Sequence, residues 1–99
     1  MTRHALKATE IVTQLSRLEN WKLSGDGAEL AIEKNWDFDN YYQTMSFVNA
    51  VAHIANQRDH HPELNVSYRR CVVRFRTHDV SGLSVSDFEC AALVDALHD

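Results

Sequence analysis

The single proline of this chain, Pro62, stands where the apolar pattern changes from helical to extended. Before it, apolar residues recur at intervals of three and four, whereas the stretch 65–78 after it is rich in β-branched residues. Proline lacks a backbone N–H and disfavours the α conformation at the residue before it. The sequence RDHHPELNVSY, residues 58–68, is therefore predicted to end a helix and to lead into a strand.

Before this point the pattern predicts a helix, a β-hairpin and a second helix. An amphipathic helix is expected over residues 4–19, and the Gly25–Asp26–Gly27 segment is a turn signal between two extended runs. The second run alternates as a half-buried strand does, although Lys34 interrupts it. The expected inward residues of the first helix are Ala8, Ile11, Val12, Leu15 and Leu18, and those of the strand are Leu30, Ile32, Trp36 and Phe38.

The middle helix carries two apolar stripes, and Asp37 and Asp39 are its expected N-terminal caps. A helix that is this broadly apolar buries more than one side. Its second face is expected either to meet another subunit or to widen the contact with a single core. The first stripe comprises Tyr41, Met45, Val48, Ala52 and Ala55, and the second comprises Phe47, Val51 and Ile54.

After Pro62 the chain is predicted to be extended, with a break near Arg69–Arg70. Val73, Phe75 and Thr77 point to one face and Val72, Arg74, Arg76 and His78 to the other. Gly82 allows a turn, and Ser84 to Asp87 form a capping box that opens a last helix. The order α-β-β-α-β-β-α predicts a single α+β domain over residues 1–99, with a four-stranded antiparallel sheet and helices on one side.

Composition excludes several classes of protein. The 99 residues have a formal net charge of −4, which argues against binding to nucleic acid. The charged N-terminal sequence does not resemble a signal peptide, and no apolar run is long enough to cross a membrane. Cys71 and Cys90 lack metal-ligand spacing and are expected to be reduced thiols in a cytoplasmic protein.

Three histidines form the main candidate site. His60 and His61 precede Pro62, and His78 lies near the far end of the following strand. If that strand returns beside the His-His loop, the three imidazoles can line one pocket. Imidazole titrates near neutrality, so one ring can donate a proton while another accepts one.

Each of these residues also has a simpler interpretation. The histidines can be solvated surface residues, and Asp87 can serve only as the helix cap. A three-histidine zinc site is disfavoured because His-His-Pro lacks the helical spacing of zinc enzymes and no carboxylate or cysteine stands at ligand spacing. Four arginines at 69, 70, 74 and 76 are similar to a nucleic-acid platform, but the stacking aromatics are missing from that face.

Taken together, several segments resemble the pterin-4a-carbinolamine dehydratases. The resemblance runs from about Leu18 to the last helix, and it implies an antiparallel sheet with three helices packed on one face. It also implies a homodimer or homotetramer whose helices meet, which would employ the second stripe of the middle helix. The residues that carry the resemblance are DHHPE at 59–63, Tyr68, THDVSGLSVSD at 77–87 and KNWDFDNYYQTMSFVNAVAHIA at 34–55.

The resemblance implies a hydro-lyase that converts 4a-hydroxytetrahydropterin into quinonoid dihydropterin and so supports pterin recycling. It implies that His60 and His78 are the acid/base pair, and that His61, Pro62 and Asp87 bind the substrate. The pterin is the substrate, so neither a cofactor nor a metal is implied. The alternative is a non-catalytic interaction module for transcription or protein assembly, which is favoured by Asn56, where the family usually carries an ionisable group.

Overall fold

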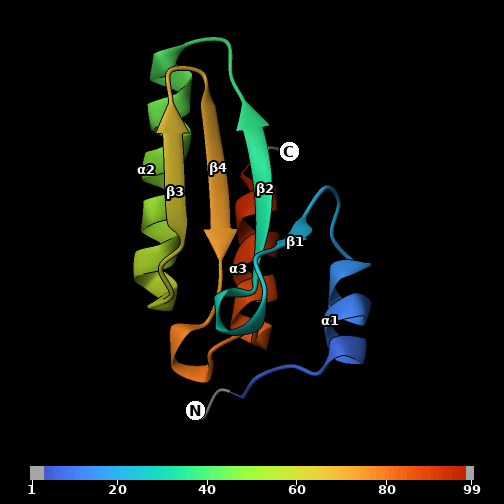
Figure 1. Cartoon of the computed structure of the whole chain (residues 1–99). Coiled ribbons are helices and arrows are strands. Elements are labelled where there is room, and N and C mark those ends of the chain that lie inside the picture. Colours follow the sequence, from blue (N-terminus) through green and yellow to red (C-terminus); the bar gives the residue numbers. More distant parts are fainter. Residues whose placement is uncertain (1–3, 98–99) are drawn as a thin grey trace.

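The computed structural model describes residues 4–97 as an α+β fold in which helices cover one side of a four-stranded antiparallel sheet (Figure 1). The expected order of elements and the fold class are confirmed. The elements are α1 (Ala8–Leu15), β1 (Lys22–Ser24), the 3-10 helix η1 (Gly27–Glu29), β2 (Ala31–Asp37), α2 (Tyr41–Arg58), β3 (Glu63–Ser67), β4 (Arg70–Phe75), the 3-10 helix η2 (His78–Val80) and α3 (Val85–Ala96).

Strand order in the sheet is β1-β2-β4-β3, and every neighbouring pair is antiparallel. β3 and β4 form a hairpin that turns at 68–69, so the break expected near Arg69–Arg70 is confirmed. In this hairpin Glu63 lies opposite Arg74 and Ser67 lies opposite Arg70. The register therefore brings the start of β3, directly after Pro62, beside the far end of β4.

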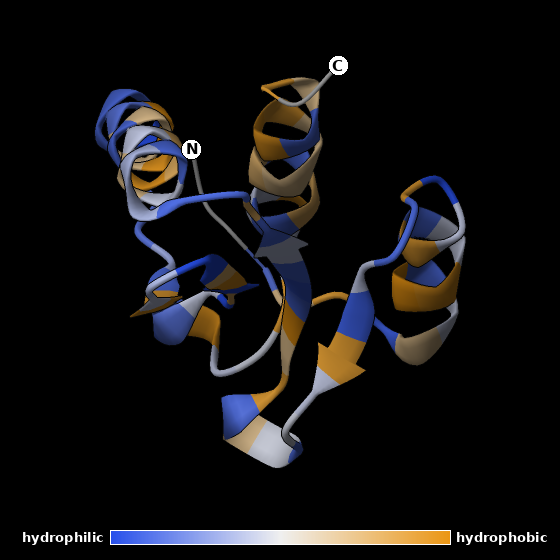
Figure 2. Ribbon diagram, turned by 90° about the horizontal axis from the view of Figure 1, so that it is seen from above, coloured by the Kyte–Doolittle hydropathy of each residue, from blue (hydrophilic) through white to orange (hydrophobic). Residues whose placement is uncertain are grey.

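Alternation along β4 separates the core from the open face of the sheet. Cys71, Val73, Phe75 and Thr77 are buried, whereas Arg74 is only partly buried. Figure 2, a view from above, shows α2 and α3 on the same side of the sheet, with α1 near the β1 edge. The core thus lies between the inward face of the sheet and these helices.

α2 differs from the expectation in its cap and in its buried face. The N-cap is Asn40, whose side chain accepts the backbone N–H of Gln43 at 2.8 Å, so the assignment to Asp37 and Asp39 is wrong. The second stripe (Phe47, Val51 and Ile54) is buried in the chain's own core, so it is not a free face for another subunit. Most of the first stripe is half-buried or exposed.

The first helix is shorter than its apolar pattern suggested. Only Ile11 is buried among the residues of α1, and Val12 is 65% exposed. The chain before the helix is held by a backbone hydrogen bond from Leu6 to Leu83, so it runs along the molecule instead of extending the helix. Because a helix of two turns can bury only a narrow stripe, the wide face predicted for it does not form.

Lys34, which breaks the alternation of β2, has a specific partner. Its Nζ lies 2.8 Å from Oδ1 of Asp95 and 4.8 Å from the centroid of the Trp36 ring. Asp95 also accepts the indole N–H of Trp21 at 3.0 Å. The last turn of α3 is thereby fastened to β2 and to the residue that precedes β1.

The four arginines at 69, 70, 74 and 76 all contact acceptors within the chain. Arg74 donates to the carbonyl oxygen of Glu29 at 2.7 Å and pairs with Glu63 at 3.3 Å. The remaining contacts are Arg69 with the carbonyl of Phe38, Arg70 with Asp37, and Arg76 with Glu29. Their guanidinium charges are thus partly balanced within the open face itself.

The turn between β1 and β2 yields a test of stability. Gly25 has φ +75°, and a Cβ there would lie 2.6 Å from the carbonyl oxygen of Glu29; Gly27 has φ +56° and open space around it. We expect Gly27→Ala to lower the free energy of unfolding by about 1–2 kcal/mol through backbone strain alone. Gly25→Ala should lower it by about 1–3 kcal/mol more, because the clash is added. Urea titration measures both, and equal losses would contradict the close approach at Gly25.

Candidate active site

The His60–His61 doublet is split between the interior and the surface. α2 ends at Arg58, and Asp59 adopts the left-handed conformation with φ 50°. The backbone N–H of His60 then donates to the carbonyl of Ala55 at 3.1 Å, which turns the chain inward. His60 is 5% exposed and stacks on Phe75 with ring centroids 6.0 Å apart, whereas His61 is exposed.

Asp87 is the partner of the buried ring. Its side chain is 0% exposed, and its Oδ1 lies 2.6 Å from Nε2 of His60. Its Oδ2 accepts the backbone N–H of Ser84 at 2.9 Å and the hydroxyl of Thr77 at 2.7 Å. The capping box predicted for α3 is confirmed, and the same carboxylate also contacts His60. These contacts offset the loss of water around a buried carboxylate.

The convergence of the His-His loop and the end of β4 is seen at this carboxylate. Thr77 and His60 both contact Asp87, and His78 follows Thr77 at the ~3.8 Å spacing of consecutive Cα atoms. His78 was expected to close the strand, but it is instead the first residue of η2, and it is exposed. Backbone hydrogen bonds between Thr77 and Gly82 close this loop.

His60 lines a cavity of about 90 Å³ with Arg58, Ser86, Glu89 and Cys90. Of the three histidines, His60 alone lines this small space. His60 is inward, His61 and His78 are on the surface, and Pro62 is half-buried between the doublet and β3.

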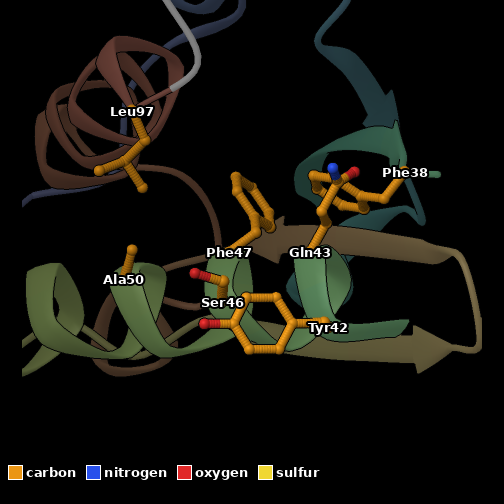
Figure 3. A pocket seen from close by; sticks show the side chains of 7 residues that line it. All are labelled: Phe38, Tyr42, Gln43, Ser46, Phe47, Ala50 and Leu97. Atoms are coloured by element: carbon orange, nitrogen blue, oxygen red, sulfur yellow. The ribbon is translucent and has the colours of Figure 1, made fainter. Parts of the chain in front are cut away.

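A larger groove lies elsewhere, between α2 and the end of α3. It measures about 410 Å³, and Figure 3 shows its side chains. Tyr42, which is 83% exposed, stands at its rim. None of the predicted site residues lines this groove. Its lining consists of Phe38, Tyr42, Gln43, Ser46, Phe47, Ala50 and Leu97.

Sequence reasoning missed Thr77 and Ser84 as members of the site. Their hydroxyl oxygens lie 2.6 Å apart in the buried network around Asp87. A signal was present for Thr77, because its alternation with Val73 and Phe75 places a hydroxyl on the buried face. Buried hydroxyls need hydrogen-bond partners, and the nearby polar group on that face is Asp87.

Other chemistry in the described part of the chain is limited. Among residues 4–97, no group of three or more histidine, cysteine, aspartate or glutamate side chains is arranged to hold a metal ion. Cys71 and Cys90 are both buried, and burial raises the pKa of the Cys71 thiol. Within the same range, no helix combines the length and apolar character that crossing a bilayer requires.

Comparison with known proteins gives one consistent family. The family model described as "Pterin 4 alpha carbinolamine dehydratase" matches residues 4–97. A relative from Paracidovorax citrulli (strain AAC00-1), provisionally named a pterin-4-alpha-carbinolamine dehydratase, is 65% identical over 96% of this chain and 82% of its own length. A relative from Bdellovibrio bacteriovorus with the same provisional name is 52% identical over 94% of this chain and 78% of its own.

Solved structures agree on the fold. A transcriptional coactivator/pterin dehydratase from Brucella melitensis superposes with a TM-score of 0.89 at 26% identity, covering 97% of this chain and all of that one. A pterin dehydratase-like protein described as a RuBisCO assembly factor in the alpha-carboxysome gives a TM-score of 0.68 at 24% identity, over 80% of this chain and 89% of its own. The second likeness concerns the fold alone.

The split doublet predicts unequal effects of one substitution at adjacent positions. His60→Ala removes a buried hydrogen bond to Asp87 and the packing against Phe75, so we expect the free energy of unfolding to fall by about 2–4 kcal/mol. His61→Ala, on the surface, should change it by less than about 0.5 kcal/mol. Urea unfolding followed by circular dichroism compares them, and similar losses would contradict the inward placement of His60.

Proposed function

Because the chain belongs to the pterin 4 alpha carbinolamine dehydratase family, we propose that it removes water from 4a-hydroxytetrahydropterin to give quinonoid dihydropterin. The observation that carries this proposal is the meeting of His60 and Thr77 at the carboxylate of Asp87, directly beside His78. This arrangement supports the idea that proton-transferring groups from two distant segments act on one substrate.

The proposed reaction needs one acid and one base. The C4a–O bond breaks as the hydroxyl takes a proton and leaves as water, the N5 lone pair forms the new C=N bond, and the N5 proton goes to a base. A positioned acid or base contributes about 10²–10⁴ in rate. The atoms and charges balance without a redox cofactor or a metal, so the pterin is the substrate and no cofactor is proposed.

We assign the acid/base roles to His60 and His78. Nε2 of His60 is engaged by Asp87, so Nδ1 is the nitrogen that would exchange a proton with the pterin. His60 lines only a small cavity, whereas His61 and His78 are exposed, so we place the pterin at the surface over His61 and His78, beside His60. His61 and Pro62 would orient the ring there, and Asp87 would act through His60.

Catalysis is tested by the decay of the 4a-carbinolamine, followed by absorbance with and without purified protein. We expect the protein to accelerate the decay, and His60→Ala or His78→Ala to remove about 10²-fold or more of that acceleration. The control is His53→Ala, another exposed histidine, on α2, which should keep the full rate. Equal decay with and without the protein would reject the enzymatic function.

The second candidate is a protein-interaction module on the same fold. It is favoured by the groove beside the exposed Tyr42 and by the coactivator description of the Brucella relative. Aromatic side chains such as tyrosine are enriched at protein interfaces. Absence of turnover in the folded protein would favour this function over the dehydratase.

A second copy of the chain is the proposed occupant of the exposed side of α2. Tyr42, Ser46 and Ala50 follow one another along α2 and line the groove (Figure 3), where another helix could pack. This contact replaces the one expected through the second stripe of α2 (Phe47, Val51 and Ile54), because that stripe is buried in the chain's own core. The cytoplasm is the proposed location, because two cysteines are too few for the disulfide framework that is typical of small secreted domains.

The oligomer is tested by light scattering after size-exclusion chromatography. We expect the wild type to have a multiple of the 11.3 kDa chain mass, and Ala50→Arg to shift it toward the monomer because a charge is buried in the contact. Thr13→Arg, on the exposed side of α1, is the control and should leave the mass unchanged. A monomeric wild type at high concentration would reject the contact.

A further inference from the structure

Thr77 carries a fully buried hydroxyl near the end of the sheet. It lies two positions after Phe75, the last residue of β4, and its side chain is 0% exposed. Its Oγ1 lies 2.7 Å from Oδ2 of Asp87 and 2.6 Å from Oγ of Ser84. It therefore bridges a carboxylate and a second hydroxyl inside the core.

The chemistry of these groups fixes the direction of every hydrogen bond when Asp87 is ionised. A carboxylate only accepts, so Thr77 must donate its one hydroxyl proton to Oδ2. The oxygen of Thr77 must then accept the hydroxyl proton of Ser84, because Thr77 has no second proton to give. On the other side of the carboxylate, Nε2 of His60 must donate to Oδ1.

This chain of donors selects one tautomer of His60. With its proton on Nε2, the neutral ring has its lone pair on Nδ1. Among residues 4–97, no buried side-chain nitrogen or oxygen lacks a hydrogen-bond partner. Since the structure shows no partner for Nδ1 of His60, this nitrogen lies where water reaches the ring, which lines the small cavity described above.

We propose that Thr77 is a positioning residue, whose hydroxyl donates to Asp87 and so holds this side chain against Nε2 of His60, which keeps its proton there and presents Nδ1 for proton transfer. The backbone of the same residue fixes the neighbouring loop, since its N–H donates to Gly82 at 2.9 Å and its carbonyl accepts from Val80 at 3.2 Å. Thr77 thus connects the orientation of His60 with the placement of His78. The kinetic consequence rests on the proposed dehydratase function, whereas the tautomer does not.

The matched pair for the test is Thr77→Val and Thr77→Ser. Valine keeps the shape of threonine and removes the hydroxyl, whereas serine keeps the hydroxyl and removes a methyl group. Without the Thr77 donor, Oδ2 of Asp87 keeps only the backbone N–H of Ser84, so the carboxylate holds Nε2–H of His60 less firmly and the Nδ1–H tautomer is expected to gain population. Two-bond ¹H–¹⁵N spectra of labelled protein report the tautomer directly, and His60→Gln identifies the signals of His60.

We expect the wild type and Thr77→Ser to show the Nε2–H tautomer, and Thr77→Val to show a large Nδ1–H population. In turnover, Thr77→Val should lose about 10- to 100-fold in kcat with KM changed less than about twofold, because the buried residue does not touch the substrate. Thr77→Ser should keep kcat within about threefold. A merely structural role would lower the stability of Thr77→Val without moving the tautomer.

The tautomer and the turnover are measured separately, so a failure of the proposed function can be told apart from a failure of the role of Thr77. If the wild type has no turnover, the proposed function fails, but a changed tautomer in Thr77→Val still supports the role of Thr77. An unchanged tautomer in folded Thr77→Val overturns that role, whatever the activity. If Thr77→Val does not fold, Ser84→Ala takes its place, because this change removes the hydroxyl that donates to Thr77. A shift toward Nδ1–H that is smaller than the one expected for Thr77→Val supports the role of Thr77. An unchanged spectrum overturns that role.

Discussion

The buried carboxylate of Asp87 is the interaction on which the site depends. It joins the loop after α2, the end of β4 and the start of α3, through His60, Thr77 and the backbone of Ser84. A buried carboxylate is costly unless donors surround it, so these three segments cannot separate without exposing an uncompensated group. The same contacts that cap α3 therefore also hold the candidate catalytic ring in place.

Much of the fold could be predicted because the apolar periods are clear. Alternation along β4 identified its buried face, and the Gly25–Asp26–Gly27 turn and the capping box marked two element boundaries. The predictions failed where neighbouring candidates could serve the same purpose, as the N-cap or as the buried face of α2. Asn40 caps α2 because it stands directly before the first helical residue, and the two stripes of α2 could not be ranked because burial depends on the neighbouring elements.

In the site, too, some features follow from the local sequence, whereas others depend on residues far away in the chain. The spacing of His60, His61 and His78 indicated a shared site, and the register of β3 and β4 explains why the segments approach each other. Adjacent side chains cannot both face inward on an extended chain, so the split of the doublet follows from local geometry. The choice of His60 as the inward ring depends on Asp87, which lies 27 positions away.

The contacts of Asp95 extend the role of α3 beyond covering the sheet. The carboxylate joins the final turn of this helix to Lys34 in the centre of β2 and to Trp21 before β1. Strand β1 is only three residues long and sits at the edge of the sheet, so a short ladder alone holds it weakly. Shortening the protein by its last helical turn would consequently loosen the opposite end of the chain, and a tag or fusion is better tolerated when that turn is kept intact.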